Sequence, residues 1–266
     1  MMGQPVIPVS TRPLKSATFI SDVHLGIQSP GVEKSKQQEL IQTLEWAFHH
    51  TDAVFLVGDI FDYWFEYKEV VPRGYTRFFG QLARMTDAGY PVVYFSGNHD
   101  FWLGTYFTNE LGIETRYDPL RLTIGGKLVE IAHGDGLGPG DHGYKALKWL
   151  LTRGWAQWMY LKLHPNWGIG LARWASGTSR HLTEDTTDYG DQERLIIHAR
   201  ERLKADPYDL FICGHRHVPK ILKLGEPRGH YINLGEWLWH RSYGVLSDGQ
   251  FTLRQTNGTI LASTQL

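Results

Sequence analysis

Cysteine is almost absent from this sequence, which has one Cys in 266 residues. A single thiol excludes an internal disulfide, and such a chain fits a reducing compartment such as the cytoplasm. Because Cys213 ends the apolar run that begins at Leu210, we expect a small buried side chain rather than a reactive one. The sequence therefore predicts neither a disulfide scaffold nor a metal site built on thiolates.

Long apolar runs and a strong net charge are also lacking. No stretch approaches the roughly 18 to 20 consecutive apolar residues that span a bilayer. The formal net charge is -1, whereas nucleic-acid binding needs a strongly basic domain, so we expect no nucleic-acid partner. No obligate protein partner is inferred either. Residues 1–15 contain three Pro and no apolar core of signal-peptide length, and we expect a disordered lead-in to one domain over residues 16–266.

Side chains that bind metals follow apolar segments at five places. The five clusters are Ser21-Asp22-Val23-His24, Gly58-Asp59, Gly97-Asn98-His99-Asp100, His133-Gly134-Asp135 and Gly214-His215-Arg216-His217. Short apolar runs bounded by Gly and Asp predict buried strands in a sheet that is covered on both faces. Sites in layered α/β proteins assemble beyond the carboxyl ends of strands, so five such ends can converge on one metal centre.

The donors in these clusters are carboxylate and amide oxygens and imidazole nitrogens, a set that suits Mn, Fe, Zn or Co. Two divalent ions about 3.5 to 4 Å apart need a carboxylate that can bridge them, and Asp59 is our candidate. We assign the remaining donors to two ions, one held by Asp22, His24 and His217 and the other by Asn98, His133 and His215. Any one of these residues alone is more often a turn or cap residue, but the ordered set favours a dinuclear site.

From Asp22 to His217, the ordered motifs resemble the calcineurin-like metallophosphoesterase superfamily. The resemblance implies an α/β fold, a four-layer αββα sandwich, that hydrolyses phosphoric esters or anhydrides with two divalent ions. Manganese is the expected ion, with iron and zinc as alternatives. The resemblance implies the same ligands and gives His99 a catalytic role, facing the substrate phosphate to stabilise charge or protonate the leaving oxygen, with Asp100 orienting it.

The segment from about residue 141 to 180 differs in composition from the rest of the chain. It contains five of the ten Trp, and six basic residues against one acidic residue. We expect two or three short helices, broken near Gly154, Pro165 and Gly168. Three alternatives are open: a lid that binds acyl chains and phosphates, an element that lies in a membrane interface, or ordinary packing. The position of this insertion between two ligand clusters favours the first two.

The insertion is similar to that of the UDP-2,3-diacylglucosamine hydrolase branch. That resemblance implies cleavage of the pyrophosphate of UDP-2,3-diacylglucosamine to lipid X and UMP, under a lid with a groove for two acyl chains, at the inner face of the cytoplasmic membrane. The implied substrate contacts are Asn98, His99, Asp141, Tyr144, Ser179 and Arg180. Well-known members of the branch carry Arg where His99 stands. A phosphodiesterase or phosphatase acting on a soluble nucleotide or phosphoprotein is therefore the alternative, and a non-catalytic scaffold is a third.

Apolar spacing predicts the elements around these motifs. Helices are expected over residues 33–50, 75–88 and 188–204, with a short one at 105–112. Gly125-Gly126 predicts a β-hairpin within residues 120–131, and Asp248-Gly249 predicts a turn between strands at 243–246 and 251–254. A further strand is expected at 231–234. The aromatic residues that follow Asp59 are interpreted as core packing, with Asp62 close to the ligands.

Overall fold

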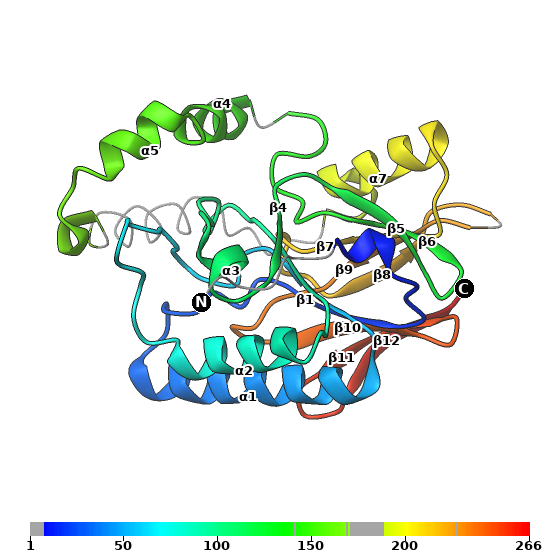
Figure 1. Cartoon of the computed structure of the whole chain (residues 1–266). Coiled ribbons are helices and arrows are strands. Elements are labelled where there is room, and N and C mark those ends of the chain that lie inside the picture. The colour runs from blue at the N-terminus through cyan, green and yellow to red at the C-terminus, as the bar shows by residue number, and fades with distance from the viewer. Residues whose placement is uncertain (1–7, 141, 169, 171–188, 227) are drawn as a thin grey trace.

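Two β-sheets lie at the centre of the molecule, and helices cover their outer faces (Figure 1). The computed structural model describes residues 8–140, 142–168, 170, 189–226 and 228–266. The seven-stranded sheet has the order β12 (Ile260–Gln265), β11 (Gln250–Gln255), β10 (Ser242–Ser247), β1 (Ala17–Ile20), β2 (Val54–Val57), β3 (Val92–Phe95) and β4 (Glu114–Arg116). The five-stranded sheet has the order β5 (Leu120–Ile124), β6 (Lys127–Ile131), β7 (Leu210–Cys213), β9 (His230–Asn233) and β8 (Lys220–Lys223).

Each strand that precedes a candidate ligand runs parallel to at least one of its neighbours. In the first sheet β1 pairs with β2 and β2 pairs with β3, and in the second sheet β6 pairs with β7. Every residue of β1, β2, β3 and β7 is buried, as expected for parallel strands covered on both faces. Because the carboxyl ends of parallel neighbours meet at one edge, the loops that follow these strands are brought together.

Helices complete the outer layers. α1 (Pro30–His50) and α2 (Thr76–Asp87) pack on the seven-stranded sheet, and α7 (Arg194–Ala205) packs on the five-stranded sheet (Figure 1). Buried positions of α1, such as Leu40 and Leu44, share a core with Val54 of β2, while Leu195 of α7 shares another with Phe211 of β7. The order helix, sheet, sheet, helix confirms the predicted αββα sandwich. Three short helices, α3 (Tyr106–Asn109), η1 (Val9–Thr11) and η2 (Gly190–Gln192), lie in connections.

A separate apolar layer fills the space between the two sheets. Phe19 and Phe55 of the first sheet stack with ring centroids 5.2 Å apart, and this layer includes Ile212 of the second sheet. Val9 and Leu14 belong to the same layer, with exposed fractions of 1% and 7%. The expectation of a disordered lead-in over residues 1–15 is therefore wrong for residues 8–15, because two of their side chains are buried between the sheets. Residues 1–7 lie outside the described part of the chain.

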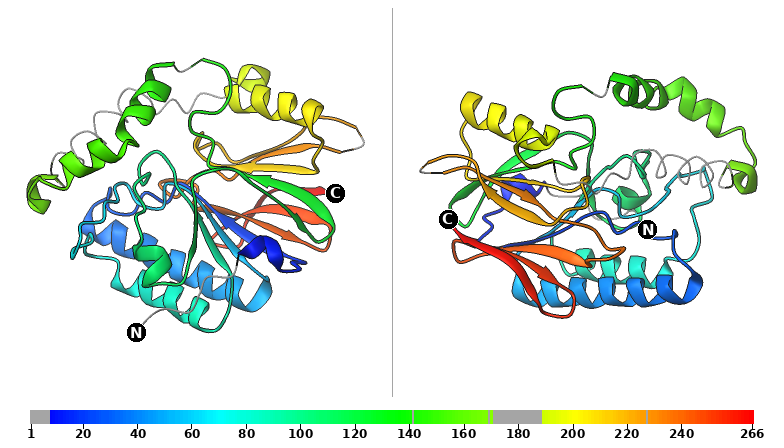
Figure 2. Two further views of the ribbon diagram at one scale, coloured as in Figure 1. Left: turned by 45° about the horizontal axis from the view of Figure 1, so that its top comes forward. Right: turned by 180° about the vertical axis from the view of Figure 1, so that it is seen from behind.

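Two helices project from the body as an arm (Figure 2). We call residues 142–168, which include α4 (His142–Leu151) and α5 (Gly154–Tyr160), the helical arm. A helix boundary at Gly154 agrees with the predicted break. Beyond the contacts near the start of α4, two contacts fix the arm to the body: Trp102 Nε1 donates to the backbone oxygen of Leu151 at 3.0 Å, and the hydroxyls of Tyr160 and Tyr63 are hydrogen-bonded at 2.8 Å.

Aromatic packing surrounds these two points. The Tyr160 ring lies on Phe65 and Trp102, with centroid distances of 4.5 and 5.1 Å. Phe61 and Trp64 pack in the core that α1 and α2 share with the sheet, so the interpretation of these aromatic residues as core packing is confirmed for them. None of the helices in the described part of the chain combines the length and the apolar character that crossing a membrane requires.

Candidate metal centre

The structure brings all seven predicted ligands to one edge of the two sheets. Asp22 and His24 follow β1, Asp59 follows β2, and Asn98 follows β3 of the seven-stranded sheet. The other three ligands, His133, His215 and His217, follow β6 and β7 of the five-stranded sheet. All seven side chains have a polar atom within 4 Å of at least one other candidate ligand from a different loop.

One triad forms around His217. Its Nε2 lies 3.3 Å from His24 Nε2 and 3.2 Å from Asp22 Oδ1, and donor atoms of the three residues all lie within 4.8 Å of one another. Two nitrogens that bind one tetrahedral ion at about 2.1 Å are about 3.3 Å apart. The two imidazoles therefore face each other at the separation that a shared ion requires.

A second group forms around Asn98. Its Oδ1 lies 3.2 Å from His133 Nε2 and 2.9 Å from His215 Nδ1, and His133 Nε2 lies 3.3 Å from Asp59 Oδ2. Asp59 also shares a group of close donor atoms with Asp22 and His133, and another with His24 and His99. Asp59 therefore lies between the donor atoms of the first triad and those of the group around Asn98.

The backbone at the candidate ligands is unusual. Seven described residues other than Gly have positive φ, and five of them are candidate ligands, namely Asp22, His24, Asp59, His215 and His217 with φ from 48° to 69°. The left-handed region is unfavourable for residues with a Cβ atom, and such strain concentrates at functional sites. The fold therefore forces five ligand side chains into orientations that ordinary loops avoid.

Two glycines allow the carboxylates to approach the neighbouring loops. A Cβ atom at Gly97 would collide with the Asp59 carboxylate, and one at Gly214 would collide with the Asp22 carboxylate. Both glycines immediately precede a candidate ligand, Asn98 and His215 respectively. The Gly-Asn and Gly-His sequence patterns therefore reflect close packing of ligand loops as well as turn formation.

The electrostatics of the site favour bound positive charge. Burial alone would raise the pKa of Asp59, but the neighbouring His133 and His99 hold the pKa of this carboxyl well below its usual range. Burial alone would lower the pKa of His133, but the Asp59 carboxylate raises it to about 10. Burial, reinforced by His133, lowers the pKa of His215 to about 4. His215 is thus neutral, whereas His133 pairs as a cation with the Asp59 carboxylate and would have to lose its proton to hold a metal ion.

His99 contacts Asp62 rather than Asp100. His99 Nδ1 lies 3.6 Å from Asp62 Oδ1 and 3.2 Å from the backbone oxygen of Asp62. The Asp100 carboxylate instead accepts hydrogen bonds from the backbone amides of Gly97, Asp59 and Ile60, at 2.7, 3.2 and 2.8 Å. The expectation that Asp100 orients His99 is therefore wrong in this structure, because the loops that hold Asp59 use up its acceptors. Its role is to brace those loops.

The helical arm begins beside the second ligand group. Tyr144 and Lys148 of α4 both donate to Asp135 Oδ2, each at 2.5 Å, and Asp135 follows His133 by two residues. Of the predicted substrate contacts, Asn98, His99 and Tyr144 are therefore placed at or near the ligand loops. The remaining three, Asp141, Ser179 and Arg180, lie outside the described residues.

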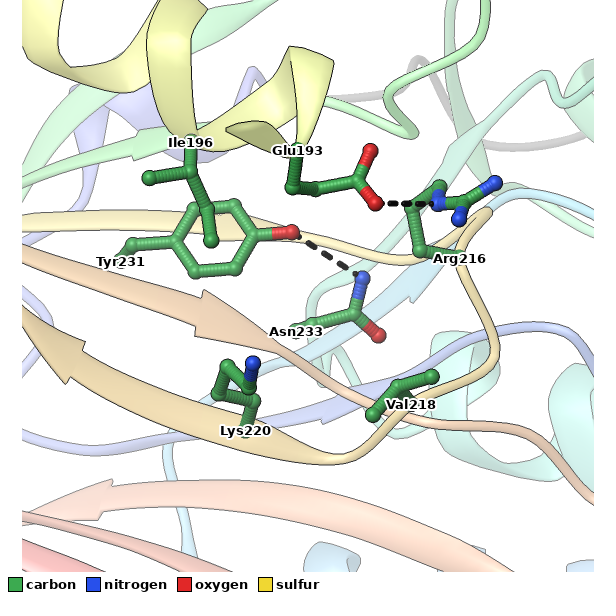
Figure 3. Close-up of a pocket in the computed structure, with 7 residues that line it drawn as sticks. All are labelled: Glu193, Ile196, Arg216, Val218, Lys220, Tyr231 and Asn233. Atoms are coloured by element: carbon green, nitrogen blue, oxygen red, sulfur yellow. Dashed lines mark hydrogen bonds and ion pairs between the residues drawn. The ribbon is translucent and has the colours of Figure 1, made fainter. Parts of the chain in front are cut away.

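A polar pocket lies behind the loop that carries His215 and His217 (Figure 3). There Arg216 Nε donates to Glu193 Oε2 at 2.9 Å, and Asn233 Nδ2 donates to the backbone oxygen of Gly214 at 2.8 Å. These contacts tie the ligand loop to the start of α7 and to the end of β9. The contact of Glu193 could not be predicted from the sequence, since no local pattern links residue 193 to residue 216.

The family model for calcineurin-like phosphoesterases matches residues 16–219. The chain belongs to the calcineurin-like phosphoesterase family. Membership of this family implies that divalent metal ions bind, and the donor set described above fits such ions. The match covers the seven candidate ligands and the whole helical arm.

Individual relatives extend this result along most of the chain. A protein of Porphyromonas gingivalis named UDP-2,3-diacylglucosamine hydrolase is 36% identical over 242 residues, covering 85% of this phosphoesterase and 92% of that protein. A protein of Aeromonas salmonicida with the same name is 28% identical and covers 90% of this chain and 93% of its own length. The phosphoesterase Yfce from E. coli, a solved structure, is 14% identical with a TM-score of 0.48, covering 94% of this chain and 98% of that one.

Proposed function

We propose that this phosphoesterase hydrolyses the pyrophosphate of UDP-2,3-diacylglucosamine to 2,3-diacylglucosamine 1-phosphate and UMP. The observation that carries the proposal is an arm with exposed Trp side chains attached beside two groups of metal ligands, in a chain 36% identical to a protein named for that reaction. A soluble substrate gives no reason to expose Trp149 and Trp158, which are each 59% exposed.

We assign the metal ligands as the sequence predicts. Asp22, His24 and His217 would hold one ion, Asn98, His133 and His215 would hold the other, and Asp59 would serve both. Mixed oxygen and imidazole donors without thiolate favour manganese, with iron or zinc able to use the same site. When bound, the two ions supply Lewis acidity and an activated water for in-line attack on phosphorus.

The other side chains of the site act on the substrate. His99 is in position to donate a proton or a hydrogen bond to the phosphate, and Asp62 rather than Asp100 orients its imidazole. We propose that Asn98, His99 and Tyr144 contact the substrate, which is supported by the bond of Asn98 to His133 and of Tyr144 to Asp135. Asp141, Ser179 and Arg180 are proposed as substrate contacts only because the sequence resembles the UDP-2,3-diacylglucosamine hydrolase branch.

The helical arm, as part of an insertion over about residues 141–180, is proposed to act as a lid for the two acyl chains. Its described apolar side chains include Leu147, Trp155 and Met159, which are between 51% and 56% exposed. Cations lie against its indole rings, with Arg153 over Trp149 at 4.0 Å and Lys162 over Trp158 at 5.0 Å. Basic helices with Trp and Leu bind membrane interfaces, so we propose peripheral binding at the inner face of the cytoplasmic membrane.

The substrate is tested by comparing lipid-linked and soluble diphosphates. The purified protein with Mn²⁺ is expected to release UMP from UDP-2,3-diacylglucosamine much faster than from UDP-N-acetylglucosamine, which has no acyl chains. Equal rates on the two would contradict the proposal and favour a soluble nucleotide as the substrate.

Membrane binding is tested separately with vesicles. Trp158→Ala should reduce sedimentation with vesicles that contain anionic phospholipid, because it removes an exposed indole from the arm. Tyr117→Ala is the matched control, since Tyr117 is 57% exposed but lies on the body after β4. Equal loss in both variants, or no loss in either, would contradict a role of the arm in membrane binding.

A further inference from the structure

Lys36 is a charged side chain that the fold buries completely behind the candidate metal centre. It lies in α1 with an exposed fraction of 0%, and its Nζ donates a hydrogen bond to the backbone oxygen of His24 at 2.8 Å. Glu33, one turn earlier in the same helix, has a carboxylate oxygen 3.3 Å from the same Nζ. Lysine is almost never fully buried unless it is paired, and an ordinary ion pair within a helix lies in solvent. The burial of Lys36 therefore calls for a role at His24.

The His24 peptide is held on both sides. Its backbone N–H donates to the backbone oxygen of Asp59 at 3.0 Å, and its backbone oxygen accepts from Lys36. His24 has φ of 48°, in the left-handed region that a residue with a Cβ atom adopts only when its surroundings impose it. In this conformation the imidazole is 1% exposed and its Nε2 faces His217 Nε2.

We propose that Lys36 is a positioning residue, whose ammonium group holds the His24 peptide in the left-handed conformation that directs the imidazole to the ion shared with Asp22 and His217. The proposal rests on the ligand assignment of the proposed function but not on the identity of the substrate. Lys36 would support only the ion held by His24. Among the described residues, Lys36 forms no hydrogen bond with the group around Asn98.

The same face of α1 supports a second loop independently. Glu39, which follows Lys36 at a spacing of three, accepts hydrogen bonds from Arg241 Nη1 at 2.6 Å and Thr256 Oγ1 at 2.9 Å. Residues three apart lie on one face of a helix, so Glu33, Lys36 and Glu39 form a row along α1. Glu39 does not bond to His24, and Glu39→Gln therefore weakens the same helix face without removing the contact that the proposal needs.

The test measures manganese binding rather than turnover. Free Mn²⁺ is followed by electron paramagnetic resonance during titration of the metal-free full chain and its Lys36→Met variant, in which the side chain keeps its length but loses the donor. Loss of a group that orients a ligand typically weakens metal binding about 10- to 100-fold. In the Lys36→Met variant we expect the affinity for one of the two Mn²⁺ ions to fall by that factor, and the affinity for the other to equal that of the wild type.

Two controls separate positioning from general damage to the helix. Lys34→Met removes an exposed lysine of the same helix, and Glu39→Gln removes the neighbouring support; both should bind two Mn²⁺ ions as the wild type does. If Lys36→Met does not fold, Lys36→Gln is used instead, because it keeps a shorter donor. It should also lower the affinity for one of the two Mn²⁺ ions. Wild-type affinity for both ions in the Lys36 variant, or equal weakening of both, would overturn the proposal.

The metal titration and the hydrolysis assay together distinguish a wrong substrate from a wrong role of Lys36. A wild-type chain that binds two Mn²⁺ ions but leaves UDP-2,3-diacylglucosamine intact contradicts the substrate and leaves the role of Lys36 standing. A wild-type chain that binds fewer than two ions contradicts the ligand assignment, and the Lys36 proposal falls with it.

Discussion

Asp100→Asn tests whether the Asp100 carboxylate braces the loops around Asp59. One oxygen of Asp100 accepts from Gly97 N at 2.7 Å, and the other accepts from Ile60 N at 2.8 Å and from the Tyr94 hydroxyl at 2.5 Å. The substitution replaces one oxygen with an amide donor. If the amide nitrogen takes the place of the first oxygen, which also accepts from Asp59 N at 3.2 Å, two buried donors lose their acceptor and meet another donor.

The expected loss of stability is large for a single isosteric change. Each buried donor left without an acceptor costs about 1–3 kcal/mol, so two of them cost about 4 kcal/mol. In a chain of this size the melting temperature falls by about 2–4 °C per kcal/mol, which gives a fall of about 8–16 °C. Tyr94→Phe removes one donor and strands no backbone amide, so its cost should be about 1 kcal/mol.

Calorimetry in the presence of EDTA measures this loss without a contribution from bound metal. Asp62→Asn is the comparison, because Asp62 rather than Asp100 lies beside His99, and its main effect should be lower turnover. A wild-type melting temperature for Asp100→Asn, together with lower turnover and an altered pH profile, would refute the bracing role and restore Asp100 as the residue that orients His99.

Three further predictions follow from the same geometry. Asp59→Ala should abolish both metal binding and turnover, whereas His99→Ala should retain two metal ions and slow turnover about 10²- to 10⁴-fold. Metal analysis of both variants checks this prediction, and loss of metal from His99→Ala would contradict the division of roles between the two residues. EDTA should lower the melting temperature and Mn²⁺ should restore it, because an ion that binds only the folded chain stabilises it, and an unchanged value in calorimetry would argue against a preformed site. Cys213 should not react with a thiol reagent in the native protein, since burial raises the pKa of its thiol well above the usual value, and should give one reactive thiol after denaturation; fast native labelling would contradict the placement of Cys213 in β7.

The central strands and the ligand clusters could be predicted from the sequence because each carries its own signal. β1, β2, β3 and β7 are largely apolar runs that end two or three residues before a candidate ligand, and the β5–β6 hairpin is marked by Gly125-Gly126. The predicted helices at 33–50 and 75–88 agree with α1 and α2 within a few residues. The helix expected at 188–204 begins later, at Arg194, after the short η2.

The strands β4, β8 and β12 were missed for a physical reason. They lie at the edges of their sheets, and none of them has a continuous buried run, so their sequences do not show the apolar signal of a central strand.

The contacts that support the candidate ligand loops could not be predicted from the sequence, for a related reason. Asp100 bonds to amides about forty positions away, and Lys36 bonds to a backbone oxygen, so neither contact leaves a pattern of residue types. Spacing on α1 identified its apolar side, and a lysine beside that side is ordinarily assigned to solvent. The ligands themselves were found because their chemistry depends on side-chain identity.

The two points that fix the helical arm to the body have a mechanical consequence. Tyr63 directly follows Asp62, and Trp102 lies shortly after His99, so the arm rests on the same two chain segments that present the imidazole. Under the proposed function, acyl tails that contact the arm would act on the two chain segments that hold His99. Shortened tails should then reduce the rate of bond cleavage as well as affinity, because binding energy far from the reacting bond supports the reacting geometry.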